Sequence, residues 1–176
     1  MHFAVGEGTV TAAPKAGSSS IRMALFGRLY DVREREEPEG YWVAFVRHPL
    51  ARLVSCYQHW IVDRFHHRMA IQGLTERMPF PYFVEAVSAI PDSRADMHFQ
   101  SQSAIIRGEP DFIGRVESLA EDWRHVQKHF NARPIGRHNS TQHADWQSFY
   151  TPELRAVAVE RYREDMERFY ESDLHR

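Results

Sequence analysis

Short apolar runs alternate along the chain with longer segments in which apolar residues recur at helical spacing. Residues 9–13 form a short β-prone stretch, and residues 41–46 form an almost continuous apolar run, typical of a strand buried on both faces. A third short strand is expected at residues 111–115. Each of the first two runs passes through a short polar break into a helical pattern, so the chain is predicted to repeat a strand–loop–helix unit.

Helices are predicted where apolar residues lie three or four positions apart. The pattern places them at residues 21–29, 50–61, 83–90, 119–130 and 154–169. Ser118-x-x-Glu121 has the form of a capping box, and Thr151-Pro152 has the form of an N-cap followed by a proline at the first helical position. Because parallel strands need long crossovers, the alternation predicts an α/β, three-layer fold with a short parallel sheet flanked by helices.

Composition narrows the classes of protein that fit this pattern. A length of 176 residues and a hydrophobic content of 43% suit one sizeable core, so a single domain over residues 1–176 is expected. The formal net charge of −2 argues against a general nucleic-acid binder. No apolar run approaches the roughly 18 residues of a membrane span, and the only cysteine, Cys56, cannot form an internal disulfide. We therefore expect a cytoplasmic protein without a membrane span, and the sequence does not indicate its oligomeric state.

A loop of small residues separates the first predicted strand from the first predicted helix. It reads Pro14-Lys-Ala-Gly-Ser-Ser-Ser20, and its lysine is one of only two in the chain. Backbone N–H groups in such a loop converge on an anion at the start of a helix, while the serine hydroxyls add donors and Lys15 adds a charge. In the ATP-binding loop the lysine follows the second glycine, whereas Lys15 precedes Gly17. The loop therefore predicts a phosphate site of another kind.

The second strand-to-helix junction carries a second polar set. Arg47 ends the predicted strand, and Ser55 follows eight residues later on the predicted helix. With its two junctions, the chain resembles the sulfotransferases that use 3′-phosphoadenosine 5′-phosphosulfate (PAPS). Residues 14–20 are similar to the 5′-phosphosulfate loop of that family, and residues 46–57 are similar to its 3′-phosphate motif. His48 stands where the family usually has aspartate.

Two further segments resemble the carbohydrate sulfotransferases of the Golgi, namely residues 111–122 and Asp96-x-His-Phe-x-x-Gln102. The resemblance implies a P-loop-like fold and an enzyme that moves the sulfuryl group of PAPS to a hydroxyl of a sugar or glycan. The product nucleotide would be adenosine 3′,5′-bisphosphate, and no metal is expected. The family motifs place Lys15, Ala16, Gly17, Ser18, Ser19 and Ser20 at the 5′ end of the donor, and Arg47 and Ser55 at its 3′-phosphate. Lys15 would also stabilise charge during catalysis.

A base must remove the proton of the acceptor hydroxyl, and histidine suits this role because its pKa lies near neutrality. His98 is the first candidate because it lies in the family-like segment, and Asp96 is placed to orient it. His66 and His67 are the alternatives.

The helix after the second junction carries a polar stripe of Arg52, Ser55 and His59, which is expected to line a cleft. His59, Asp63, His66 and His67 also have helical spacings that could gather metal ligands, but exposed histidines on a helix are common, so no metal site is predicted.

Two other functions remain open from the sequence. An ATP-dependent small-molecule kinase would use the same loop, but it requires an aspartate that holds magnesium after a strand, and Asp111 precedes its strand. A non-catalytic relative that only binds the nucleotide is the other alternative, for which His48 is the main hint.

Overall fold

The computed structural model describes residues 1–136 and 145–173. Their contacts fall into two compact units. The first unit comprises residues 1–47 and 106–136, and the second comprises residues 48–105 and 145–173. The chain thus crosses from one unit to the other directly after Arg47. The expectation of one domain over the whole chain stays a prediction.

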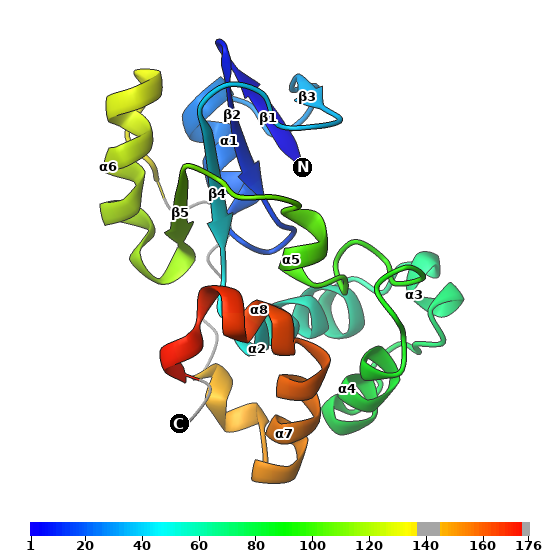
Figure 1. The fold of residues 1–176 in the computed structure, drawn as a ribbon. Coiled ribbons are helices and arrows are strands. Elements are labelled where there is room, and N and C mark those ends of the chain that lie inside the picture. The colour runs from blue at the N-terminus through cyan, green and yellow to red at the C-terminus, as the bar shows by residue number, and fades with distance from the viewer. Residues whose placement is uncertain (137–144, 174–176) are drawn as a thin grey trace. The chain divides into compact units, whose positions relative to one another are not determined.

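The first unit is built on an open sheet of five strands in the order β3-β1-β2-β4-β5 (Figure 1). Their bounds are β1 His2–Val5, β2 Gly8–Ala12, β3 Glu34–Arg35, β4 Trp42–Val46 and β5 Phe112–Arg115. β2, β4 and β5 are mutually parallel, as predicted, whereas β1 pairs antiparallel with both β2 and β3. The predicted α/β fold with a sheet flanked by helices is confirmed, but the sheet is mixed.

One face of this sheet forms an apolar core with two helices, α1 (Ser18–Phe26) and α6 (Leu119–Phe130). The strand register places Phe3, Val10 and Val43 in one row of that face. The helices add Ile21, Ala24, Trp123 and Val126 to the same cluster. The alternation of apolar residues along the strands and their helical spacing along α1 and α6 thus bring these side chains to one packed interface.

The start of α6 differs from the predicted capping box. A one-turn 3₁₀ helix, η2 (Val116–Ser118), precedes α6, and Ser118 occupies the N-cap position as expected. Its hydroxyl, however, donates to Asp122 Oδ2 at 2.7 Å instead of accepting from the helix. The same carboxylate oxygen accepts the Arg115 N–H at 2.7 Å. The Ser118 hydroxyl is therefore bonded to Asp122, whereas in a capping box it would bond to a backbone N–H of the helix.

The second unit consists of helices in its described part (Figure 1). Their bounds are α2 Pro49–Tyr57, the π-helical segment η1 Gln58–Asp63, α3 His67–Ile71, α4 Phe80–Ser88, α5 Gln102–Ile105, the 3₁₀ turn η3 Trp146–Phe149, α7 Pro152–Arg161, α8 Arg163–Phe169 and the 3₁₀ turn η4 Glu171–Asp173. None of the helices within the described ranges is long and apolar enough to cross a membrane.

The C-terminal helical pattern is confirmed as core but is divided in two. Thr151 caps α7, since its hydroxyl accepts the Leu154 N–H at 3.2 Å. The helix then breaks at Tyr162, where the backbone leaves helical geometry before α8 begins. The predicted apolar stripe is buried throughout and comprises Leu154, Ala158, Tyr162, Met166 and Phe169.

Candidate active site

The loop between β2 and α1 has an unusual backbone. Lys15 has φ 67° and Gly17 has φ 76°, so both lie in the left-handed region. The loop closes through the Ala16 N–H, which donates to the Ala13 carbonyl at 3.0 Å. A lysine in this conformation costs about 1–2 kcal/mol relative to the right-handed helical region. Strained residues of this kind cluster at functional sites.

Arg47 lies against this loop. Its Nη1 donates to the carbonyl oxygen of Lys15 at 3.4 Å, across 32 residues of sequence. The contact arises because β2 and β4 are parallel neighbours, with Ala12 opposite Phe45, so the residues that follow the two strands leave the sheet at the same edge. The carboxyl ends of parallel strands are the usual place for ligand sites in open α/β sheets.

This arrangement is suited to an anion. The first turn of α1 contains three serines and no acidic residue, and first-turn N–H groups have no acceptor within their own helix. The helix dipole adds a partial positive charge there. Together with the cationic side chain of Lys15, these donors fit a phosphate or phosphosulfate group, and Arg47 adds a second cation beside the loop.

Ser55 and Arg47 belong to different units, so their shared role stays a prediction. Ser55 lies within α2, whose residues from Pro49 to Cys56 are all buried. His48, at the N-cap of α2, is also buried, and its ring stacks on Trp146 at 4.5 Å and meets Tyr170 edge-on at 5.1 Å. The residue that replaces the family's aspartate is thus packed among aromatic rings in the second unit.

The expectation that Arg52 lines a cleft is wrong. Its side chain is 1% exposed, and its two terminal nitrogens donate to the carbonyls of Gln100 at 2.7 Å and Met97 at 3.2 Å. The apolar neighbours of Arg52 on α2 place the helix in the interior on every side. An arginine there needs internal acceptors, because burying an unpaired charge is costly.

His98 and Asp96 form a hydrogen-bonded pair, as expected from their spacing. His98 Nδ1 lies 2.6 Å from Asp96 Oδ1, and the His98 N–H donates to the same oxygen at 3.0 Å. The other carboxylate oxygen, Oδ2, lies 2.6 Å from Nη2 of Arg68. The His98 side chain is 18% exposed, whereas that of Asp96 is 5% exposed. Trp60 meets the His98 ring edge-on at 5.0 Å.

The carboxylate of Asp96 stays ionised in this setting. Burial raises its pKa, but the hydrogen bonds from His98 and the charges of His98 and Arg68 outweigh that effect, and the pKa of Asp96 is lowered. An ionised carboxylate at Nδ1 favours the tautomer that carries its proton on Nδ1. The neutral ring then has its basic lone pair on Nε2, which is the chemistry a general base requires.

The alternative bases have other surroundings. His66 caps the short helix α3, where its Nδ1 accepts the Arg68 N–H at 3.2 Å. His67 follows directly, with the two ring centroids 4.1 Å apart. Within residues 1–136 and 145–173, no three or more His, Cys, Asp or Glu side chains gather into a group that could hold a metal ion.

Asp111, the residue that a kinase would need at the phosphate site, lies elsewhere in the first unit. Its Oδ2 accepts the Trp42 N–H at 2.7 Å, where β4 and β5 begin. The loop of Lys15 follows the carboxyl ends of the strands, at the opposite edge of the sheet. Asp111 therefore has a structural role and does not support the kinase alternative.

Several residues around the site were not identified from the sequence. Arg68 pairs with Asp96 across 28 residues, and Arg161 and Tyr162 donate to the Phe99 carbonyl across more than 60 residues. No local pattern marks such partners. Arg52 did carry a signal, because it is the only charged residue in the apolar run from Pro49 to Cys56.

Comparison with known proteins identifies the family of the chain. The family model described as "Sulfotransferase family" matches residues 15–171, which run from Lys15 in the loop of residues 14–20, here called the anion loop, to the turn after α8. No curated protein and no solved structure matches the chain. Because the match covers most of its length, the chain belongs to the sulfotransferase family.

Proposed function

We propose that this sulfotransferase takes its sulfuryl group from PAPS and transfers it to a hydroxyl of a carbohydrate. The loop from Lys15 to Ser20 holds the 5′-phosphosulfate, Arg47 and Ser55 hold the 3′-phosphate, and His98 accepts the proton of the hydroxyl. The observation that carries the donor assignment is the contact between Arg47 and the Lys15 carbonyl, which joins the two phosphate motifs at one sheet edge.

The donor supplies an activated sulfuryl group, and the bond that breaks joins sulfur to the bridging oxygen of the 5′-phosphate. As that oxygen gains negative charge, Lys15 and the first-turn N–H groups of α1 stabilise it. These donors are held in place before the reaction, because the backbone of the loop is fixed by Gly17 and by the hydrogen bond of Ala16. Arg47 contributes alignment at the other end of the nucleotide.

His98 acts on the acceptor side. Asp96 holds its ring through Nδ1, so that Nε2 takes the hydroxyl proton while the oxygen bonds to sulfur. A carbohydrate acceptor is supported by the likeness of residues 96–102 and 111–122 to the carbohydrate sulfotransferases.

Isothermal titration calorimetry with adenosine 3′,5′-bisphosphate and with ATP tests the donor assignment. We expect the bisphosphate to bind without magnesium and ATP to bind at least tenfold more weakly. Preference for ATP with magnesium would overturn the proposal and restore the kinase alternative.

Transfer of radiolabelled sulfate from PAPS to a panel of mono- and oligosaccharides tests the acceptor assignment. Labelled sugar is the expected product, and label on phenols or steroids alone would assign another acceptor class. Binding of the bisphosphate with no transfer to any acceptor would favour the non-catalytic relative.

A further inference from the structure

The backbone around His98 is held by a row of buried side chains in the second unit. Four consecutive carbonyls, those of residues 97–100, each accept a hydrogen bond from a side chain of α2, α7 or the residue that follows α7. We call residues 96–103 the His98 segment. Residues 97–100 lie outside helices and strands, and surface loops of this kind usually direct their carbonyls to water.

Arg52 and Cys56 approach the His98 segment from α2. Arg52 bridges the carbonyls of Met97 and Gln100, and the Cys56 thiol donates to the carbonyl of His98 at 3.2 Å. Both side chains are buried. The two contacts of Arg52 lie on either side of His98 in sequence, so they fix the direction of the backbone through that residue.

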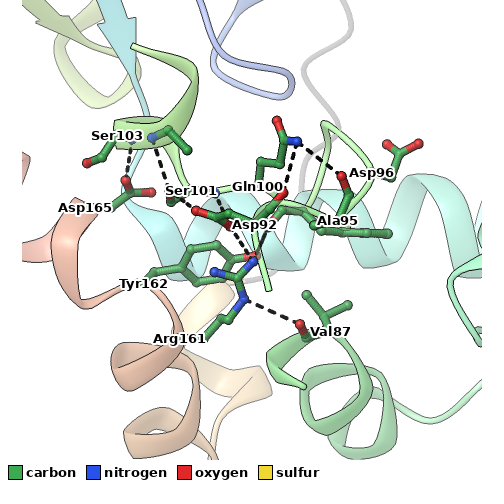
Figure 2. A network of polar contacts seen from close by, with 12 residues as sticks. Val87, Asp92, Ala95, Asp96, Gln100, Ser101, Ser103, Arg161, Tyr162 and Asp165 are labelled. Carbon is green, nitrogen blue, oxygen red and sulfur yellow. Dashed lines mark hydrogen bonds and ion pairs between the residues drawn. The ribbon is translucent and has the colours of Figure 1, made fainter. Parts of the chain in front are cut away.

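Arg161 and Tyr162 hold the carbonyl of Phe99, at 3.2 Å and 2.9 Å. Burial raises the pKa of Tyr162, so its hydroxyl stays protonated and remains a donor. Arg161 also pairs with Asp92 at 2.6 Å and reaches toward the Val87 carbonyl (Figure 2). It therefore ties the His98 segment to the end of α4.

The far end of the segment is held by two more carboxylates. Asp92 accepts the N–H and the hydroxyl of Ser101, and the fully buried Asp165 accepts the N–H groups of Gln102 and Ser103 at 2.8 Å and 2.7 Å (Figure 2). The His98 side chain itself is held by Asp96. Asp96 also accepts the His98 N–H, so it links the ring to the backbone that the other side chains hold.

We infer that Arg52, Arg161 and Tyr162 are positioning residues for His98, acting on catalysis through the backbone carbonyls of Met97, Phe99 and Gln100. The inference rests on the proposed role of His98 as the base. A base works only within hydrogen-bond reach of the proton it removes, and a displacement of about 1 Å can cost about 10²-fold in rate. Arg52 and Tyr162 are buried and the Arg161 side chain is 9% exposed, and all three donate to carbonyls of residues next to His98 or one position further.

The test compares two variants that remove one hydroxyl each. Tyr162→Phe removes a donor to the His98 segment, whereas Tyr150→Phe removes a matched donor to the Leu50 carbonyl at 3.0 Å in the same unit. We expect Tyr162→Phe to lower kcat about tenfold, with KM for PAPS and Kd for the bisphosphate within twofold. Tyr150→Phe should leave kcat within twofold.

Arg52→Lys extends the test, because lysine keeps the charge but cannot bridge two carbonyls. Its kcat should fall further than that of Tyr162→Phe, again with unchanged Kd. Equal kcat in the wild type, Tyr162→Phe and Arg52→Lys, while His98→Asn is inactive, would overturn the positioning role alone. An active His98→Asn would instead remove His98 from the proposed function. If Arg52→Lys does not fold, Tyr162→Phe decides.

Discussion

The two units hold their candidate site residues in place by different physical means. In the first unit, the anion loop depends on backbone geometry, with left-handed residues at Lys15 and Gly17 and the start of a helix. In the second unit, the His98 segment depends on long buried side chains that reach it from distant positions. A loop that depends on backbone geometry needs small residues in a fixed order. A segment held by side chains needs only hydrogen-bond donors, which can come from distant positions in the sequence. The first is therefore visible in local sequence and the second is not.

The largest loss of turnover is expected from replacing His98, the proposed base of the second unit. His98→Asn should lower turnover about 10²–10⁴-fold, because general base catalysis is lost. The Kd for the bisphosphate, measured by calorimetry, should stay unchanged. His67→Asn, at an exposed position on α3, serves as the control and should stay near wild type. Loss of turnover in His67→Asn with normal turnover in His98→Asn would move the base to the alternative site.

The next largest effect is expected at Lys15, the one charged side chain of the anion loop. Lys15→Ala should lower turnover about 10²–10³-fold, as is typical when one preorganised donor is lost. Lys128→Ala changes the only other lysine, which is exposed near the end of α6, and should keep full activity. Thermal unfolding of both variants should match the wild type. Equal sulfate transfer by Lys15→Ala and Lys128→Ala would contradict the role of Lys15.

Glycine variants separate backbone strain from function. Gly17→Ala and Gly6→Ala both place a side chain on a left-handed residue, with φ 76° and 57°, and neither new Cβ would clash. Each should lose about 1–2 kcal/mol of stability in urea unfolding. Only Gly17→Ala should also weaken bisphosphate binding, since Gly6 lies in the turn between β1 and β2. Unchanged binding in Gly17→Ala would show that the loop geometry is not needed.

The smallest effect is expected at Asp92, in the pH dependence of the free energy of unfolding. Burial raises the pKa of Asp92, but hydrogen bonds from Ser101 and Arg161 outweigh it, and the pKa is lowered on folding. The ionised group therefore adds stability above its unfolded pKa of about 4, and this is lost as the pH falls through the lower folded pKa. The gap in free energy of unfolding between wild type and Asp92→Asn should be largest at pH 7 and should shrink below about pH 4. A gap that is independent of pH would contradict this, and the exposed Asp63→Asn is the control.

Sequence patterns predicted the parts of the fold that depend on neighbouring residues. The parallel strands were identified because their apolar runs are buried, and α7 was identified by its capping threonine. β1 and β3 were missed because they are short and because β3 lies in a charged segment without an apolar run. The sulfotransferase class is confirmed by the family match, whereas PAPS, the sugar acceptor and the individual site residues stay predictions.

The candidate site divides in the same way. Lys15 with Gly17, and Asp96 with His98, could be named as candidates because the members of each pair lie two positions apart in sequence. The residues that hold the carbonyls of the His98 segment were missed because they come from α2 and from the end of α7. Both lie more than 40 positions away in sequence, in opposite directions. Helical periodicity also misplaced Arg52, since it treats every charged residue as exposed.

The glycine at the start of α1 has a consequence for how the protein should be handled. Gly17 occupies the N-cap position, where a serine or aspartate side chain would normally satisfy the first-turn N–H groups and add about 1 kcal/mol. In the proposed complex, a phosphate of the nucleotide would supply the oxygens that this helix does not receive from its own cap. If the nucleotide binds there, the protein without it should unfold at a lower temperature, and adding adenosine 3′,5′-bisphosphate should raise that temperature again.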